Sequence, residues 1–185
     1  MSKESNSDLD FTHHFNAATA VAEPVKTVAE VAKLSEEAVI GESKLTSNGY
    51  FVRLFPDAPK RKPQHTPPLV LIVEDDDVTG MIIERVMTMN KFQVKRAANR
   101  AQIVEGIKMR PDLVLLDVML PDANGFDILN RIRAHEKMAD LPVLMLSSLG
   151  ALDDILKGLK LGANGYLTKP AKSKALMDAI NNVLA

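Results

Sequence analysis

The composition is that of an ordinary globular protein with almost balanced charge. The 185 residues contain 23 Lys and Arg against 24 Asp and Glu, so no global positive field argues for nucleic acid. There is no cysteine, which excludes disulfides and thiol chemistry and permits a reducing compartment. The sequence has no run of about 18 apolar residues and no apolar signal-peptide core. We therefore expect a cytoplasmic protein with no membrane partner.

The composition changes near residue 66 and divides the chain into two unequal parts. Residues 1–65 have short apolar stretches and lead into the proline-rich segment PDAPKRKPQHTPP, residues 56–68. Proline lacks a backbone N–H and disfavours both helix and sheet. We expect an N-terminal extension and linker over residues 1–65, mostly helical or disordered, followed by one globular domain over residues 66–185.

The extension carries weak signals of its own. In TVAEVAKL (27–34), Thr27 and Glu30 have the spacing of a capping box. SEEAVIGES (35–43) fits a second short helix, and GYFVRLF (49–55) alternates like a strand. This order faintly resembles a winged helix-turn-helix, a DNA-reading unit, but the acidic second helix would repel phosphates. We favour an amphipathic docking or oligomerising helix and do not expect DNA as a partner.

Five strands are predicted from Leu69 onward. Continuous apolar runs predict three buried strands, and two further stretches are weaker strand candidates. The three runs are LVLIV (69–73), LVLL (113–116) and PVLML (142–146); the weaker candidates are FQVKRA (92–97) and GYLT (165–168).

Helical patterns lie between these strands. Ile82, Val86 and Met89 recur at i, i+4 and i+7, and an apolar set from Leu152 to Leu159 marks another helix that Gly162 would cap. Further helices are predicted over 99–109, over 124–136 and near the end of the chain. Apolar strands alternating with helices imply a parallel sheet covered on both faces. We predict a doubly wound, flavodoxin-like α/β fold with five parallel strands in the order 2-1-3-4-5.

Acidic residues follow two of the most apolar strands. Glu74 and Asp75 come directly after the first strand, and Asp117 ends the third. In doubly wound sheets, ligands bind at the carboxyl ends of the strands where the strand order reverses, so we expect these carboxylates to meet in one crevice. Three carboxylates repel each other unless a cation joins them, and oxygen ligands suit Mg²⁺. Ser147 and Lys169 follow the fourth and fifth strands, which completes a set suited to phosphoryl transfer.

Residues 68–185 resemble the receiver domain of bacterial two-component response regulators, of the chemotaxis-regulator type. Four segments carry the resemblance, in order and at suitable spacing. They are VLIVEDD (70–76), PDLVLLDVMLPDANGFDIL (111–129), LPVLMLSS (141–148) and GANGYLTKP (162–170).

The resemblance implies a role for each residue of the set. Asp117 would accept a phosphoryl group from a phosphohistidine. Glu74, Asp75, Asp117 and the backbone carbonyl of Met119 would hold Mg²⁺. Ser147 would hydrogen-bond a phosphoryl oxygen and Lys169 would pair with another. The resemblance also implies a cis Lys169–Pro170 bond, and a Tyr166 ring that turns inward when Ser147 moves toward the phosphate. Glu at 74, Ser at 147 and Ala at 171 depart from the commoner family residues.

Three functions compete at this point. The leading one is a signalling module that takes its phosphoryl group from a sensor histidine kinase or a histidine phosphotransfer protein. It would act on a downstream protein by contact or phosphorelay, and it would not be an enzyme on other substrates. A Mg²⁺-dependent phosphohydrolase with an aspartyl nucleophile would need a second acid two residues after Asp117, where this sequence has Met119. The third is a transcription regulator with an N-terminal DNA-binding segment.

Overall fold

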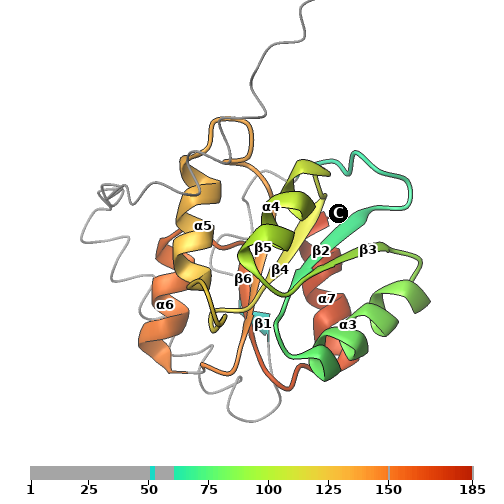
Figure 1. Cartoon of the computed structure of the whole chain (residues 1–185). Coiled ribbons are helices and arrows are strands. Elements are labelled where there is room, and N and C mark those ends of the chain that lie inside the picture. The colour runs from blue at the N-terminus through green and yellow to red at the C-terminus, as the bar shows by residue number, and fades with distance from the viewer. Residues whose placement is uncertain (1–50, 53–60, 150, 185) are drawn as a thin grey trace, which may run out of the picture.

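The computed structural model describes residues 51–52, 61–149 and 151–184 (Figure 1). The strands are β1 (Phe51–Val52), β2 (Leu69–Val73), β3 (Gln93–Ala97), β4 (Leu113–Leu116), β5 (Val143–Ser147) and β6 (Gly165–Thr168). The helices are α3 (Asp77–Met89), α4 (Arg100–Lys108), α5 (Gly125–Ala134), α6 (Leu152–Lys160) and α7 (Ser173–Leu184). None of these described helices is long and apolar enough to cross a membrane. The helices predicted within residues 27–43 lie outside the described residues.

The strands form one sheet in the order β1-β6-β5-β4-β2-β3. Strands β2 to β6 pair in parallel, and their spatial order is the predicted 2-1-3-4-5, so the predicted fold is confirmed. Strand β1 is an addition, because it pairs antiparallel with the free edge of β6. A strand was predicted within residues 49–55, and its described part is the two residues of β1. The pattern of the segment did not say which strand it would join.

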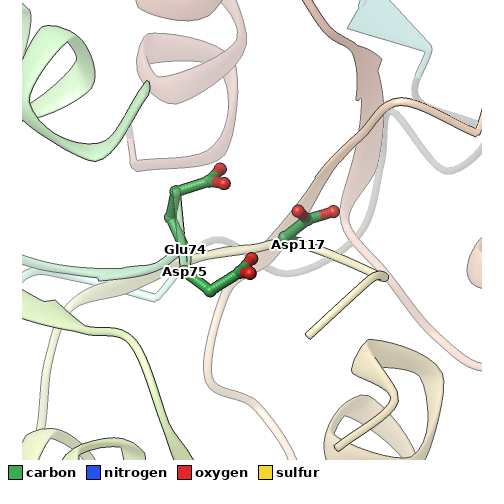
Figure 2. A group of neighbouring side chains, drawn as sticks. All are labelled: Glu74, Asp75 and Asp117. Atoms are coloured by element: carbon green, nitrogen blue, oxygen red, sulfur yellow. The ribbon is translucent and has the colours of Figure 1, made fainter. Parts of the chain in front are cut away.

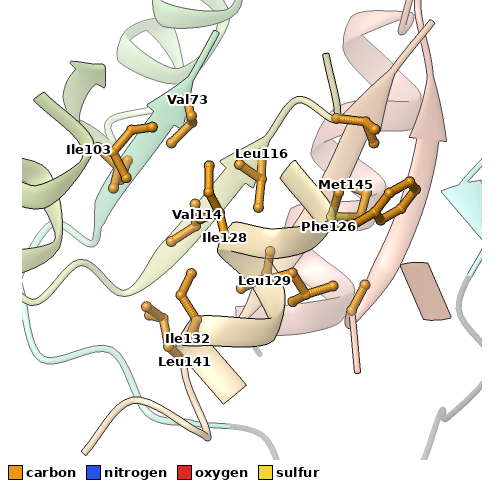
Figure 3. Packing of buried hydrophobic residues seen from close by; sticks show 14 of the residues in the cluster. Val73, Ile103, Val114, Leu116, Phe126, Ile128, Leu129, Ile132, Leu141 and Met145 are labelled. Carbon is orange, nitrogen blue, oxygen red and sulfur yellow. The ribbon is translucent and has the colours of Figure 1, made fainter. Parts of the chain in front are cut away.

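Helices cover both faces of the sheet. Successive side chains of a strand point to opposite faces, so Leu71 and Val73 of β2 enter one core while Val70 and Ile72 enter the other. The first core packs against α4, α5 and α6, as Figure 3 shows for Ile128 and its neighbours. The second core packs against α3 and α7. In a strand that is buried on both faces, every side chain enters a core. The sequences of β2, β4 and β5 are therefore continuous apolar runs.

Helix α3 is present as predicted, but a different face of it is buried. It begins at the N-cap Asp76, whose side chain accepts a hydrogen bond from the Thr79 N–H at 2.7 Å. Of the predicted apolar series, Ile82 and Met89 are 60% and 74% exposed, whereas Val86 is half-buried against the second core. The residues that reach the core are instead Gly80, Ile83 and Met87. Both series have helical spacing, and contact with the sheet selects one of them. The outcome is an exposed apolar stripe on α3, formed by Val78, Met81, Ile82 and Met89.

The segment before β2 is fixed to the domain by a buried carboxylate that sequence reasoning did not single out. Asp112 is 2% exposed, and its side chain accepts hydrogen bonds from the backbone N–H groups of Gln64, His65 and Leu69. The His65 Nδ1 atom lies 2.9 Å from the same carboxylate. Burial opposes the charge of Asp112, but these hydrogen bonds outweigh it and lower the pKa of the carboxyl. Residues 64–69 therefore belong structurally to the folded domain.

Candidate functional site

The register of β2 and β4 brings the acidic residues to one place. Val73 pairs with Leu116, and the Asp117 N–H donates to the Val73 carbonyl at 3.0 Å. One carboxylate oxygen from each of Glu74, Asp75 and Asp117 lies within 4.8 Å of the others (Figure 2). Glu74 and Asp117 are only 2% and 5% exposed, whereas Asp75 is open to solvent. The predicted convergence of the three acids in one crevice is therefore present, with one side open to water.

Lys169 from the end of β6 reaches the same crevice. Its Nζ atom lies 2.6 Å from Asp117 Oδ2 and 2.5 Å from Glu74 Oε2. Burial by itself would lower the pKa of Lys169, but the hydrogen bonds and charges of Asp117 and Glu74 outweigh that effect and raise it. Lys169 is thus held as a cation, and the Lys169–Pro170 bond is cis as the resemblance implied.

The charge balance of the crevice leaves room for a cation. Three carboxylates face one ammonium group, so ionisation of all four leaves two negative charges in excess. Burial raises the pKa of Glu74, against the opposing effect of Lys169, and the Asp117 charge raises it further. A set of oxygen donors with one side open to solvent fits a partly hydrated Mg²⁺, which keeps several waters when bound to proteins. The residues present therefore fit a magnesium ion.

The loop after β4 wraps around Asp117. The Met119 N–H donates to Asp117 Oδ1 at 3.2 Å, and Met119 forms an isolated bridge with Asn124. Gly125 packs against the backbone of Asp117, since a Cβ atom at this position would lie 2.1 Å from the Asp117 carbonyl oxygen. Sequence reasoning missed this role, for which the signal was the "NG" pair that begins α5. The loop holds one oxygen of Asp117 while Lys169 holds the other.

Ser147 and Tyr166 lie behind the acids and are both fully buried. The Lys169 N–H donates to the Ser147 carbonyl at 2.8 Å, which ties the ends of β5 and β6 together. The Ser147 Oγ accepts from the Leu149 N–H at 3.2 Å, and the Tyr166 hydroxyl donates to the Leu149 carbonyl at 2.8 Å. Burial raises the pKa of Tyr166 to about 12, although the Ser147 side chain acts against the rise. The Tyr166 ring is thus turned inward, and the side chains of Tyr166 and Ser147 both hydrogen-bond to the backbone of Leu149.

A cavity of about 500 Å³ lies at the opposite end of the sheet and is separate from this crevice. It is bounded by the residues before β4 and β5, among them Pro111 and Leu141, and by Arg61 of the preceding segment. None of the three acids lines it. We place the functional site at the acidic crevice, because Glu74 and Lys169, whose pKa values are shifted by burial and by neighbouring charged groups, lie there.

Comparison with known proteins agrees with the geometry. The family model described as "Response regulator receiver domain" matches residues 70–181. The transcriptional regulator RpaA of Synechocystis is 34% identical over 119 residues, covering 63% of this chain and 49% of RpaA. CusR of Escherichia coli is 37% identical over 119 residues, covering 62% of this chain and 50% of CusR. The crystal structure of Vibrio cholerae CheY4 matches with a TM-score of 0.59 and 26% identity, over 63% of this chain and 98% of CheY4.

The relatives correct one expectation drawn from the sequence. DNA was not expected as a partner, on the grounds of a net charge near zero and an acidic segment at residues 35–43. RpaA is named as DNA-binding and CusR as a transcriptional regulatory protein, so that expectation is wrong. The expectation failed because the net charge of a whole chain does not show whether one part of its surface is basic. The chain spans about half the length of these relatives. Over residues 70–181, the chain belongs to the response regulator receiver domain family.

Proposed function

We propose that this protein accepts a phosphoryl group on Asp117 and signals through the resulting change of conformation. An Asp117 oxygen attacks the phosphorus of a phosphohistidine, the N–P bond breaks, and the imidazole leaves as the acyl phosphate forms. The observation that carries this proposal is the meeting of Asp117, Glu74, Asp75 and Lys169 at the ends of three strands. We further propose that residues 66–185 form the receiver domain and residues 1–65 an extension, whose last two residues, Gln64 and His65, fold onto the domain through Asp112.

Each residue of the site has a distinct task in this proposal. The Lys169 ammonium moves from Asp117 Oδ2 to a phosphoryl oxygen, and Ser147 donates its hydroxyl to another. Glu74, Asp75, Asp117 and the Met119 carbonyl would hold Mg²⁺, which would neutralise charge on the phosphoryl oxygens. Met119 N–H keeps Asp117 oriented through its hydrogen bond to Oδ1. The reaction leaves the phosphoryl group on the protein, which fits a signalling module rather than an enzyme with turnover on small phosphate esters.

The surface beside the crevice supports a protein as the phosphoryl donor. Helix α3 begins two residues after Asp75 and exposes the apolar stripe of Val78, Met81, Ile82 and Met89. Met119, on the loop after Asp117, is 58% exposed. Apolar side chains of this size beside an acidic opening fit the apolar surface of another protein. We propose that a sensor histidine kinase or a histidine phosphotransfer protein docks here.

The test is mass spectrometry of the whole protein after incubation with acetyl phosphate and Mg²⁺. We expect the mass of one added phosphoryl group, lost in Asp117→Asn and retained in Asp122→Asn, a change of an exposed acid in the same loop. An adduct that survives Asp117→Asn would refute the assignment. Steady release of phosphate from p-nitrophenyl phosphate would instead favour a hydrolase.

Transcription regulation is the second candidate, because RpaA and CusR are transcriptional regulators. A cytoplasmic location would suit both candidates. A gel-shift assay across salt concentrations separates them, since binding through phosphate contacts weakens steeply as salt rises. The assay should use the full chain with and without beryllofluoride, which imitates the phosphoryl group. Salt-sensitive binding that changes with beryllofluoride supports the second candidate, and absence of binding in both states counts against it.

A further inference from the structure

The outer edge of β6 is an interaction surface, and this chain supplies its occupant. Strand β6 pairs with β5 on one side, so its other side would otherwise present unpaired backbone groups to solvent. Strand β1 takes that place, with Phe51 opposite Leu167 and Val52 opposite Tyr166. Strand β1 also contacts α7. It is the strand at the end of the sheet remote from β3.

The strand that β1 covers contains Tyr166 and leads directly into Lys169, two residues of the candidate site. Tyr166, the register partner of Val52, is buried with its hydroxyl on the Leu149 carbonyl. Its ring lies so close to α6 that a Cβ atom at Gly158 would be 3.2 Å from it. Three residues further on, Lys169 contacts Asp117 and Glu74. Any restraint that β1 places on the backbone of β6 therefore acts directly beside both side chains.

We propose that docking of β1 on β6 and phosphorylation of Asp117 are positively coupled, so that each favours the other. The proposal rests on the proposed function, since it requires a phosphoryl group on Asp117. In this structure β1 is docked while Tyr166 is inward and hydrogen-bonded to Leu149, next to the Ser147 hydroxyl. A docked β1 holds β6 in the arrangement with inward Tyr166. A phosphoryl group that draws on Ser147 and Lys169 stabilises the same ends of β5 and β6.

The coupling gives the N-terminal part of the chain a role in signalling. Residues 1–50 directly precede β1 in the sequence, so docking of β1 connects the phosphorylation site to this part of the chain. By thermodynamic reciprocity, undocking of β1 must weaken the binding of a phosphoryl group by the same factor that phosphorylation strengthens docking. The reciprocal effect can be measured from either side.

The test measures backbone amide hydrogen exchange of the full chain with Mg²⁺, with and without beryllofluoride. We expect beryllofluoride to slow exchange in β1 and on the outer edge of β6 by about fivefold or more, the usual range of such coupling. The reciprocal arm uses Val52→Pro, which removes a backbone N–H from β1, and Val52→Thr, which keeps a β-branched residue there. Val52→Pro should weaken beryllofluoride binding by about the same factor, and Val52→Thr should leave it unchanged.

The outcomes separate this inference from the function on which it rests. If ¹⁹F spectra show that the wild type binds no beryllofluoride, the proposed function fails. If beryllofluoride binds but exchange in β1 is unchanged, or if Val52→Pro binds it as tightly as the wild type, the coupling alone is refuted. Far-UV circular dichroism and the Mg²⁺ affinity of Val52→Pro, both expected to match the wild type, show that its site is intact.

Discussion

Removal of the Lys169 charge tests the electrostatics of the crevice. The Nζ atom lies 2.5 and 2.6 Å from two carboxylates, and in an effective dielectric of about 20 each such pair contributes about 6 kcal/mol before desolvation is subtracted. Desolvation offsets most of this gain, and removal of one partner of a buried pair costs about 3–5 kcal/mol. The Lys169 side chain is 15% exposed. We therefore expect Lys169→Met to lower the free energy of unfolding by about 3 kcal/mol at pH 7 without Mg²⁺.

Magnesium and pH should both reduce this deficit. Mg²⁺ replaces the missing positive charge, so it should stabilise Lys169→Met more than the wild type. Burial raises the pKa of Glu74 above its usual value of 4.5, so Glu74 destabilises the fold as pH rises through the raised pKa. Lys169 opposes that rise, so its removal raises the pKa of Glu74 further and increases the cost of keeping Glu74 charged. The deficit of Lys169→Met should therefore be largest near neutral pH and shrink as the pH falls and Glu74 is protonated.

The assay is urea unfolding followed by far-UV circular dichroism, with chelator and with Mg²⁺. Lys160→Met is the matched control, because Lys160 is an exposed residue at the end of α6. We expect it to change the free energy of unfolding by less than about 0.5 kcal/mol. The reasoning would be refuted if Lys169→Met were as stable as the wild type in chelator, or if Mg²⁺ stabilised both equally.

Three further substitutions test the supporting structure. Asp112→Asn should cost about 2–3 kcal/mol at pH 7. Because hydrogen bonding lowers the pKa of Asp112 below 3.8, the wild type keeps this stability above pH 3.8 and loses it as pH falls further, so unfolding curves of the two proteins should converge in strong acid. Gly125→Ala places a Cβ atom against the Asp117 carbonyl oxygen and should cost about 3 kcal/mol or more in thermal unfolding; a neutral result would show that α5 shifts freely. Arg133→Met should cost about 3 kcal/mol in urea unfolding, because three hydrogen bonds to the loops before β5 and β6 are lost, and a change below 1 kcal/mol would contradict this role.

Much of the fold could be predicted from the sequence, because a buried segment has a recognisable pattern of apolar residues. Strands β2, β4 and β5 are covered on both faces and therefore admit only apolar residues. Glu74, Asp75 and Asp117 break those runs where the strands end, and parallel strands place such ends at one edge of the sheet. The identity of the acidic residues and their common edge were thus determined by the sequence. Ser147 and Lys169 followed from their positions after two further strands, and Tyr166 from the family resemblance.

Contacts between distant segments were decided only by the tertiary structure. The phase of α3 is one example, since Ile82 and Ile83 both fit a helical period and only packing on the sheet buries Ile83. The register of β1 on β6 and the hydrogen bonds of Asp112 to residues 64–69 are others. A periodic pattern indicates which residues of one segment are to be buried. It carries no information about the segment they will pack against, which lies tens of residues away in the sequence. That partner is selected when all the surfaces are packed together.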